Sequence, residues 1–169
     1  MSLSLKQKLI VGFIGVALVS VIVGAVGFTN LKKLDNADTM LYEKMTVPIG
    51  QLLEISVSFQ RIRVNVRDLL TSENNEQMNK AMETISELTK IIETNCVEYE
   101  KLIIIDSMRT NFNAFKDARV AYRAELSKVE ELVRAGKKKE AEYIIENSGK
   151  KAAMAEQVEI DKMVDMKLK

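Results

Sequence analysis

The segment from Leu9 to Leu31, LIVGFIGVALVSVIVGAVGFTNL, carries no charged residue over its 23 positions. About 20 consecutive apolar residues are enough for a helix to cross the hydrocarbon core of a bilayer. The segment therefore predicts a transmembrane helix. Residues 1–8 would lie on one side of the membrane, and residues 32–169 would form a domain on the other side.

A cleaved signal peptide is the competing interpretation of this segment. The apolar part of a signal peptide is usually about 7 to 15 residues long and ends in a cleavage site of the A-x-A type. The segment here is longer, and Ala25-Val26-Gly27 matches such a site poorly, so a membrane anchor is favoured. Flanking charges leave the orientation open, because two lysines precede the segment and two follow it.

Small side chains recur on one face of the predicted membrane helix. They lie three or four residues apart, at Ala17, Ser20, Gly24 and Gly27. Such faces allow two helices to approach closely in lipid. The alternative is that glycine is simply frequent in membrane helices, so the spacing favours a helix contact without requiring one.

The rest of the chain is balanced in charge and poor in reactive side chains. All acidic residues and all but two of the basic ones lie after Leu31, so we expect neither a nucleic-acid partner nor a polybasic membrane-surface segment. Histidine is absent and Cys96 is the only cysteine, which excludes zinc fingers, haem attachment motifs, Cys–His nucleophile pairs and internal disulfides. We expect no enzyme activity, no cofactor and no metal site.

After Lys32, apolar residues recur at alternating spacings of four and three, the pattern of long helices that each bury one row of residues, here called a seam. The first helix would run from Leu31 to about Leu70. Pro48 either kinks it or marks a fresh start after Thr46. The first seam consists of Leu41, Met45, Pro48, Leu52, Ile55, Phe59, Ile62, Val66 and Leu69.

Two further seams follow a polar break at residues 71–75. The third helix has Asp106 or Ser107 as its expected N-cap and ends at Gly136. Arg119 falls in register in its seam, which makes it a candidate for a buried charge. We favour the alternative that its stem is buried while the charge reaches solvent. The second seam consists of Met78, Ala81, Ile85, Leu88, Ile92, Tyr99 and Leu102, and the third of Met108, Phe112, Phe115, Tyr122, Leu126, Val129 and Val133.

The fourth helix is expected to start near Lys138 and has the thinnest apolar face, which residues 147–149 interrupt. Four long helices joined by short turns predict an all-α, antiparallel up-down-up-down four-helix bundle. In this topology the first helix starts and the fourth ends at the same pole, so Lys169 should return to the membrane side. The fourth seam consists of Ala141, Ile145, Ala152, Ala155, Met163 and Val164.

Four characteristic stretches follow one another along the chain: KLIVGFIGVAL, NLKKL, LYEKMTVPIGQLLEISVSFQRIRVNVRDLL and FKDARVAYRAELSKVEELVRAGKKKEA. In this order they resemble the membrane helix and four-helix-bundle sensor domain of methyl-accepting chemotaxis receptors, over essentially the whole chain. The resemblance implies a homodimeric receptor in the bacterial inner membrane, with residues 1–8 in the cytoplasm and residues 32–169 outside it. It also implies a second membrane helix and a cytoplasmic signalling region after Lys169.

In amino-acid receptors of that family, arginines of the first bundle helix hold a small anionic ligand at the dimer interface. Arg63 and Arg67 match two of those arginines, whereas the position of a third falls on Ser58. The resemblance therefore implies an organic acid or amino acid as ligand without identifying aspartate or serine. Level with the two arginines on the fourth helix, bundle geometry predicts Tyr143 and Asn147. For Tyr143 the favoured alternative is a residue at the rim of the packed core.

The residues themselves also single out this pair of arginines. Arg63 and Arg67 are four apart on one helix face, beside the first seam, and guanidinium groups offer forked donors for a carboxylate. The alternative is that they are solvated or pair with Glu142 or Glu146. Two other functions stay open: the bundle could bind a periplasmic protein, or it could be the sensor of a histidine kinase or cyclase.

Overall fold

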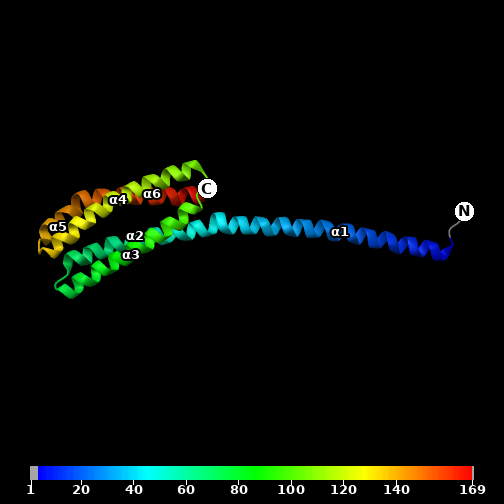
Figure 1. The fold of residues 1–169 in the computed structure, drawn as a ribbon, viewed down its shortest axis with the longest axis horizontal. Coiled ribbons are helices and arrows are strands. Elements are labelled where there is room, and N and C mark those ends of the chain that lie inside the picture. Colours follow the sequence, from blue (N-terminus) through cyan, green and yellow to red (C-terminus); the bar gives the residue numbers. More distant parts are fainter. Residues whose placement is uncertain (1–3, 169) are drawn as a thin grey trace. The chain divides into compact units, whose positions relative to one another are not determined.

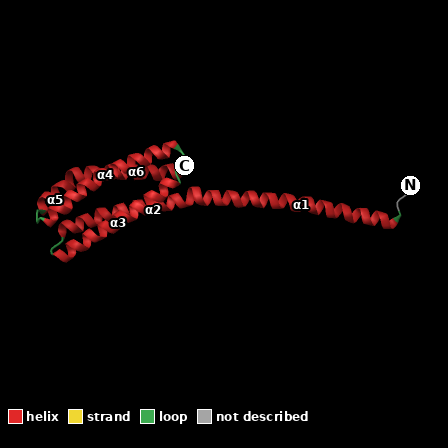
Figure 2. Ribbon diagram, viewed as in Figure 1, coloured by secondary structure: helices red, strands yellow, loops and turns green. Residues whose placement is uncertain are grey.

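A computed structural model describes residues 4–168, which are helical apart from short turns and contain no strand (Figure 2). Two compact units, Met1–Glu43 and Lys44–Lys169, are described separately below. The first three residues of the predicted cytoplasmic N-terminus, and Lys169, lie outside the described residues.

The first unit is built on one long helix, α1 (Leu5–Leu41), which contains the apolar segment (Figure 1). Ser4 caps it: the Gln7 backbone N–H donates to Ser4 Oγ at 3.4 Å, and the Ser4 N–H donates to Gln7 Oε1 at 2.9 Å. None of the residues of α1 is buried. Within residues 4–168, the helical stretch that starts at Leu5 alone is long and apolar enough to cross a membrane.

The second unit is the predicted antiparallel four-helix bundle. Its first two helices form one hairpin, and its third and fourth form another (Figure 1). The fourth helix consists of three consecutive segments, two α-helical ones with a π-helical turn between them. The elements are α2 (Val47–Thr71), α3 (Asn75–Lys101), α4 (Asp106–Arg134), α5 (Lys138–Ile144), the π-helix η2 (Ile145–Gly149) and α6 (Lys150–Leu168).

Lysine contacts fasten both poles of the bundle. Lys167 Nζ, at the end of α6, donates to the Lys44 carbonyl oxygen at 3.1 Å. The first bundle helix therefore starts where the fourth ends, as the topology predicted. At the opposite pole, here called the distal pole, Lys138 Nζ donates to the Ser72 carbonyl oxygen in the α2–α3 turn.

The first seam is buried from Pro48 onward, while Leu41 and Met45 upstream are exposed. A second π-helix, η1 (Tyr42–Thr46), precedes α2, and Pro48 lies in the first turn of α2. Thr46, directly before α2, is itself in the α-helical conformation, so the chain stays helical from η1 into α2 and Pro48 does not follow a helix end. The expected fresh start after Thr46 is therefore not seen; a π-turn precedes Pro48 instead, and changes of geometry of this kind occur where proline removes a backbone donor.

Aromatic rings fill the centre of the bundle and join its two hairpins. Phe59 of α2 and Tyr122 of α4 meet edge to face, with ring centroids 5.6 Å apart. Tyr99 of α3 and Phe112 of α4 form a tilted pair at 5.5 Å. Such pairs stabilise a core by about 0.5–1.5 kcal/mol beyond the area they bury. The predicted members of the second and third seams are buried, apart from the half-buried Met78 and Leu102.

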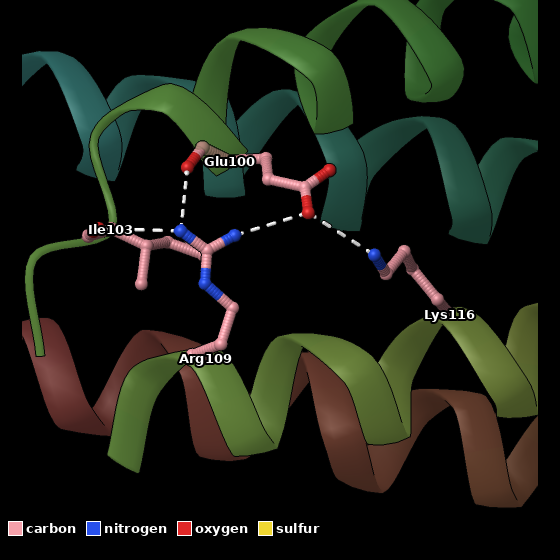
Figure 3. Close-up of polar contacts among 4 residues, drawn as sticks. All are labelled: Glu100, Ile103, Arg109 and Lys116. Atoms are coloured by element: carbon pink, nitrogen blue, oxygen red, sulfur yellow. Dashed lines mark hydrogen bonds and ion pairs between the residues drawn. The ribbon is translucent and has the colours of Figure 1, made fainter. Parts of the chain in front are cut away.

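Glu100, near the end of α3, ties the α3–α4 turn to α4 (Figure 3). Its Oε1 accepts hydrogen bonds from Arg109 Nη1 at 3.1 Å and from Lys116 Nζ at 3.2 Å. Arg109 Nη2 also donates to the carbonyl oxygens of Glu100 and Ile103, both at 3.5 Å. One carboxylate and one guanidinium thus hold a turn that has no glycine or proline.

The expected N-cap of α4 is wrong by one or two residues. Asp106 is already the first helical residue, and Ile105 occupies the cap position without a side-chain hydrogen bond. Ile103 in the turn is only 8% exposed. Its burial in the core constrains the path of the turn and thereby the residue at which α4 begins. The acidic side chain of Asp106 in the first turn complements the helix dipole instead of capping it.

Arg119 departs from its expected exposure. The residue is 7% exposed, and its Nη1 donates to Glu156 Oε1 of α6 at 2.9 Å. The expectation that its charge reaches solvent is therefore wrong. A buried carboxylate on the facing helix takes the place of water as the partner of the guanidinium.

The fourth seam departs from its predicted register. Ala155 is exposed and Ala152 is only half-buried. A π-helix closes hydrogen bonds over five residues instead of four, so η2 shifts the buried positions that follow it by one. Met163 remains a buried member as predicted. The buried positions of the fourth helix are Ala141, Gly149, Ala153, Glu156, Ile160, Met163 and Lys167.

Candidate functional site

A cavity of about 480 Å³ lies near the distal pole, between α2, α4 and the fourth helix. Its volume lies in the range of pockets that hold small molecules, about 300–1,000 Å³. The lining combines three cations, two carboxylates, a phenol and an apolar floor. The lining residues are Arg63, Val66, Arg67, Leu70, Thr71, Tyr122, Glu142, Ile145, Glu146, Gly149, Lys150 and Ala153.

Arg63 is held in place by its own helix. Its Nη1 donates to Gln60 Oε1 at 3.0 Å, and its guanidinium carbon lies 5.8 Å from the centroid of the Phe59 ring. Gln60 in turn donates from Nε2 to Gln157 Oε1 on α6. These contacts orient the guanidinium without neutralising it, because Gln60, which accepts its hydrogen bond, is an uncharged amide.

Arg67 follows one helical turn later, in the same cavity wall. Among the described residues, neither Arg63 nor Arg67 takes part in an ion pair. Glu142 and Glu146, the predicted alternative partners, line the same cavity without pairing with these arginines. Two guanidinium groups therefore face a cavity with their charge uncompensated by a direct carboxylate contact.

Tyr122 contributes a neutral hydroxyl at the bottom of the cavity. The residue is 3% exposed. Burial raises the pKa of Tyr122 to about 12, an effect that the Glu156 charge increases and that the nearby arginines, Arg63 among them, partly oppose. The phenol therefore stays protonated at neutral pH and can both donate and accept a hydrogen bond.

Three of the five residues of η2, namely Ile145, Glu146 and Gly149, form part of the cavity wall. Gly149 is buried there, and a Cβ at its position would lie 3.0 Å from the Ile144 carbonyl oxygen. Few real Cβ contacts are that short, so the close approach of the backbone favours glycine. Ser148, also in η2, donates from Oγ to Glu125 Oε2 of α4 at 2.5 Å.

Tyr143 and Asn147, predicted beside the arginines, do not line this cavity. Tyr143 is 70% exposed and lies in a shallow hollow on the outer side of α5, next to Leu132. Asn147 is exposed, and its Nδ2 donates to the Tyr143 carbonyl oxygen at 2.8 Å. Ser58, at the position where the resemblance to amino-acid receptors implied a third arginine, is 2% exposed in the bundle core.

The sequence did not predict several residues of the cavity lining, among them Gly149 and Lys150. Ile145 was predicted in the fourth seam but not as part of a cavity wall. The tripeptide Asn147-Ser148-Gly149 was the available signal, since a polar break in an apolar face marks a local change of helix geometry. The sequence predicts an interruption of the apolar face there, and the structure has a π-helix at that point. The change of register brings Gly149 to the wall.

The lining can bind a small polar solute through complementary groups. Arginines offer forked N–H donors to a carboxylate, and glutamates accept hydrogen bonds from an ammonium or hydroxyl group. Val66, Leu70 and Ile145 supply apolar contact. In the part of the chain that the structure describes, no three His, Cys, Asp or Glu residues gather in a way that could hold a metal ion.

Comparison with known proteins assigns the chain to a family. The model of a family described as a four helix bundle sensory module for signal transduction matches residues 2–169. A search of curated proteins found no match. The match spans the apolar helix and the whole bundle, in agreement with the resemblance seen in the sequence. The chain therefore belongs to the four-helix-bundle sensory modules of signal transduction.

Proposed function

We propose that this sensory module detects a small carboxylate-bearing solute, an organic acid or an amino acid, in the cavity lined by Arg63 and Arg67. One observation carries the proposal: two guanidinium groups, one turn apart on α2, face the same cavity without an ion-pair partner among the described residues. A solute carboxylate would supply that partner. Charge-assisted, forked hydrogen bonds are among the strongest that a protein makes.

The other lining groups suggest how a solute would be oriented. The Tyr122 hydroxyl can donate to a second oxygen of the solute, while Glu142 and Glu146 can accept from an amino or hydroxyl group. Tyr143 and Asn147 remain proposed contacts only for a solute that extends beyond the cavity. Signal transduction by such a site needs no catalytic residue and no cofactor.

We also propose that the module works as a homodimer through the outer face of α2 and α6. Leu53, Val57 and Val64 on α2, and Met154 and Val158 on α6, are each at least 45% exposed. The Gln60–Gln157 hydrogen bond joins the two helices within this face. Exposed apolar residues grouped on one side of a domain are typical of interaction surfaces.

In the proposed receptor, α1 crosses the bacterial inner membrane, with residues 1–8 in the cytoplasm and the bundle outside. The face of Ala17, Ser20, Gly24 and Gly27 would contact the same face of a second subunit. A Cβ built on Gly24 or Gly27 meets no atom within 4 Å, so this face is open to such a contact. The small side chains would allow the two helix backbones to approach closely.

Signal transmission would follow from a change in the packing of the fourth helix. A solute that binds one packing of the bundle more tightly than another shifts the population toward it, and helix shifts of about 1 to 2 Å are typical of such transitions. The cavity contacts η2, and α6 continues from η2 to the pole where Lys167 meets Lys44. The proposed output is chemotaxis signalling through a cytoplasmic region after Lys169; a histidine kinase or cyclase is the alternative output.

Calorimetry on the full chain in lipid nanodiscs tests the ligand proposal. The titrants are monocarboxylates, dicarboxylates and amino acids, and the controls are the corresponding amides and alcohols. We expect at least one carboxylate to bind saturably and its uncharged analogue not to bind. A bound solute at about 100 times its Kd should stabilise the bundle by about 2.7 kcal/mol. If none of these compounds binds, the result contradicts the proposal and favours a protein partner.

A further inference from the structure

Two lysines of the fourth helix bind backbone carbonyl groups at the two ends of α2, one at each pole of the bundle. Lys167 Nζ donates to the Lys44 carbonyl oxygen at 3.1 Å, and Lys138 Nζ donates to the Ser72 carbonyl oxygen. Among the described residues, neither lysine takes part in an ion pair. Each contact therefore joins a cation to the neutral backbone of a neighbouring helix.

The two accepting carbonyl groups share a property: neither has the donor that a regular α-helix would supply. Ser72 is the C-cap residue of α2, and the carbonyl groups at a helix end have no intrahelical partner. The Lys44 carbonyl lies four residues before Pro48, and proline has no N–H to donate to it. A proline ring inside a helix also clashes with the carbonyl at that distance. Pro48 thus leaves the Lys44 carbonyl available to a donor from another helix.

Lys167 is the last position of the buried face of α6, which it continues from Ile160 and Met163, and it is only 4% exposed. Its ammonium group cannot exchange the carbonyl for water unless the packing opens, and a buried charge without a partner is costly. Apolar contacts are not directional, whereas a hydrogen bond requires a defined distance and angle. The contact with Lys44 therefore specifies where the last turn of α6 lies against the start of α2.

We propose that Pro48 and Lys167 together form a clasp, in which the proline withholds the α-helical hydrogen bond from the Lys44 carbonyl and the lysine ammonium replaces it. The clasp holds the last turn of α6 against the start of α2. Together with the Lys138–Ser72 contact at the distal pole, it joins the two helices that supply most of the cavity lining. The clasp does not depend on what the cavity binds.

Hydrogen exchange followed by mass spectrometry, on the full chain in lipid nanodiscs, tests the clasp. The readout is the exchange of the backbone amides in residues 160–167, and residues 85–92 of α3 serve as the internal reference. Lys167→Met keeps the apolar stem and removes the donor. It should speed exchange in residues 160–167 at least about tenfold, because hydrogen bonds to charged groups are strong enough to shift a local opening equilibrium by that factor.

Pro48→Ala is the decisive variant, because it changes no atom of Lys167. Alanine supplies the missing N–H and removes the ring, so the Lys44 carbonyl can form its α-helical hydrogen bond. We expect exchange in residues 160–167 to become faster even though α2 gains helix propensity. The double variant Pro48→Ala/Lys167→Met should exchange no more than about twice as fast as the faster single variant, because both changes break the same contact.

Two control variants alter the same helices without touching the clasp. Lys162→Met removes a lysine of α6 that pairs with Glu159 at the surface. Gly50→Ala raises the helix propensity near the start of α2, where its Cβ meets no other atom, and leaves the backbone donors unchanged. Neither control should change exchange in residues 160–167.

Each outcome supports or overturns the clasp. Faster exchange confined to the end of α6 in both single variants, without a further gain in the double variant, supports it. Exchange at the parent rate in Lys167→Met or in Pro48→Ala overturns it, and so do two effects that multiply in the double variant. Equally faster exchange in residues 85–92 also overturns it, because a contact at one pole should not decide the stability of the whole bundle. No solute is added, so these results are independent of the proposed ligand.

Discussion

Arg119 on α4 and Glu156 on α6 form an ion pair in the core of the bundle, with Arg119 Nη1 2.9 Å from Glu156 Oε1. The two side chains are 8% and 0% exposed. Arg119 Nη2 and Glu156 Oε2 are also buried, and neither has a hydrogen-bond partner in the described structure. Because both charges lose their hydration, we infer that the pair sets which face of α6 meets α4 more than it adds net stability.

Removal of one partner should destabilise the bundle strongly. Arg119→Met leaves the Glu156 carboxylate buried without its partner, and we expect a loss of about 3–5 kcal/mol in the free energy of unfolding. The double variant Arg119→Met/Glu156→Leu should recover most of that loss, because no charge is then buried. Urea denaturation followed by circular dichroism measures both values.

A second arginine on α4 provides the matched control for this prediction. Arg123 pairs with Glu93 at the surface, where both side chains are about half exposed. Arg123→Met should therefore change the free energy of unfolding by no more than about 1 kcal/mol. If Arg119→Met/Glu156→Leu is as unstable as Arg119→Met alone, the loss does not come from a buried, unpaired Glu156 charge. That result would contradict the prediction.

The buried carboxylate also predicts how stability depends on pH. Burial raises the pKa of Glu156 above its ordinary value of 4.5, although Arg119 opposes the shift. Burial likewise raises the pKa of Glu130. A raised pKa means that the folded protein binds the proton more tightly than the unfolded chain. The associated stability is complete below the ordinary pKa and is lost as the pH rises through the folded pKa.

We therefore expect the free energy of unfolding to decrease as the pH rises from 4.5 toward neutrality. Glu125 has the opposite effect on the pH dependence of stability, because hydrogen bonds from Lys128 and Ser148 lower its pKa. The stability that Glu125 contributes is lost only as the pH falls. Denaturation midpoints measured across this range should decline less steeply in Glu156→Gln than in the wild type. Parallel profiles for the two proteins would refute this prediction.

Two glycines in the bundle should respond oppositely to alanine. Gly136, two residues beyond the end of α4 at Arg134, has φ of 74°, a backbone conformation that alanine adopts only with strain. Gly136→Ala should cost about 1–2 kcal/mol. Gly50 lies within α2 with open space around its Cα, so Gly50→Ala should add about 0.5–1 kcal/mol. Thermal melts of the two variants should move in opposite directions, and a shared direction would contradict this account.

Much of the fold could be predicted from periodicity alone. The seams of α2, α3 and α4 were predictable because long helices with one buried face repeat their apolar residues at spacings of four and three. The fourth helix was harder. Its buried face contains Gly149, Glu156 and Lys167, which no hydropathy pattern marks as core, and a π-turn shifts the register. Arg119 could be placed in its seam, but its partner lies 37 positions away in the sequence.

The candidate site was predictable on one helix and not on the other. Arg63 and Arg67 stand four apart on α2, a spacing that fixes their common face without knowledge of the rest of the fold. Residues on the fourth helix had to be predicted by counting from the distal turn, and such a count assumes regular helical geometry. The π-helix η2 departs from that geometry. As a result Glu146 and Gly149 line the cavity, whereas Tyr143 and Asn147 lie outside it.

The central claim, that Arg63 and Arg67 bind a solute carboxylate, is tested most directly by comparing two variants of α2. Arg63→Ala/Arg67→Ala removes both cavity guanidiniums, while Arg61→Ala removes an exposed guanidinium of the same helix that does not line the cavity. The measurement is the shift in melting temperature caused by the carboxylate that binds the wild type. We expect the shift to vanish in the double variant and to persist in Arg61→Ala. An undiminished shift in Arg63→Ala/Arg67→Ala would contradict the assignment of the site.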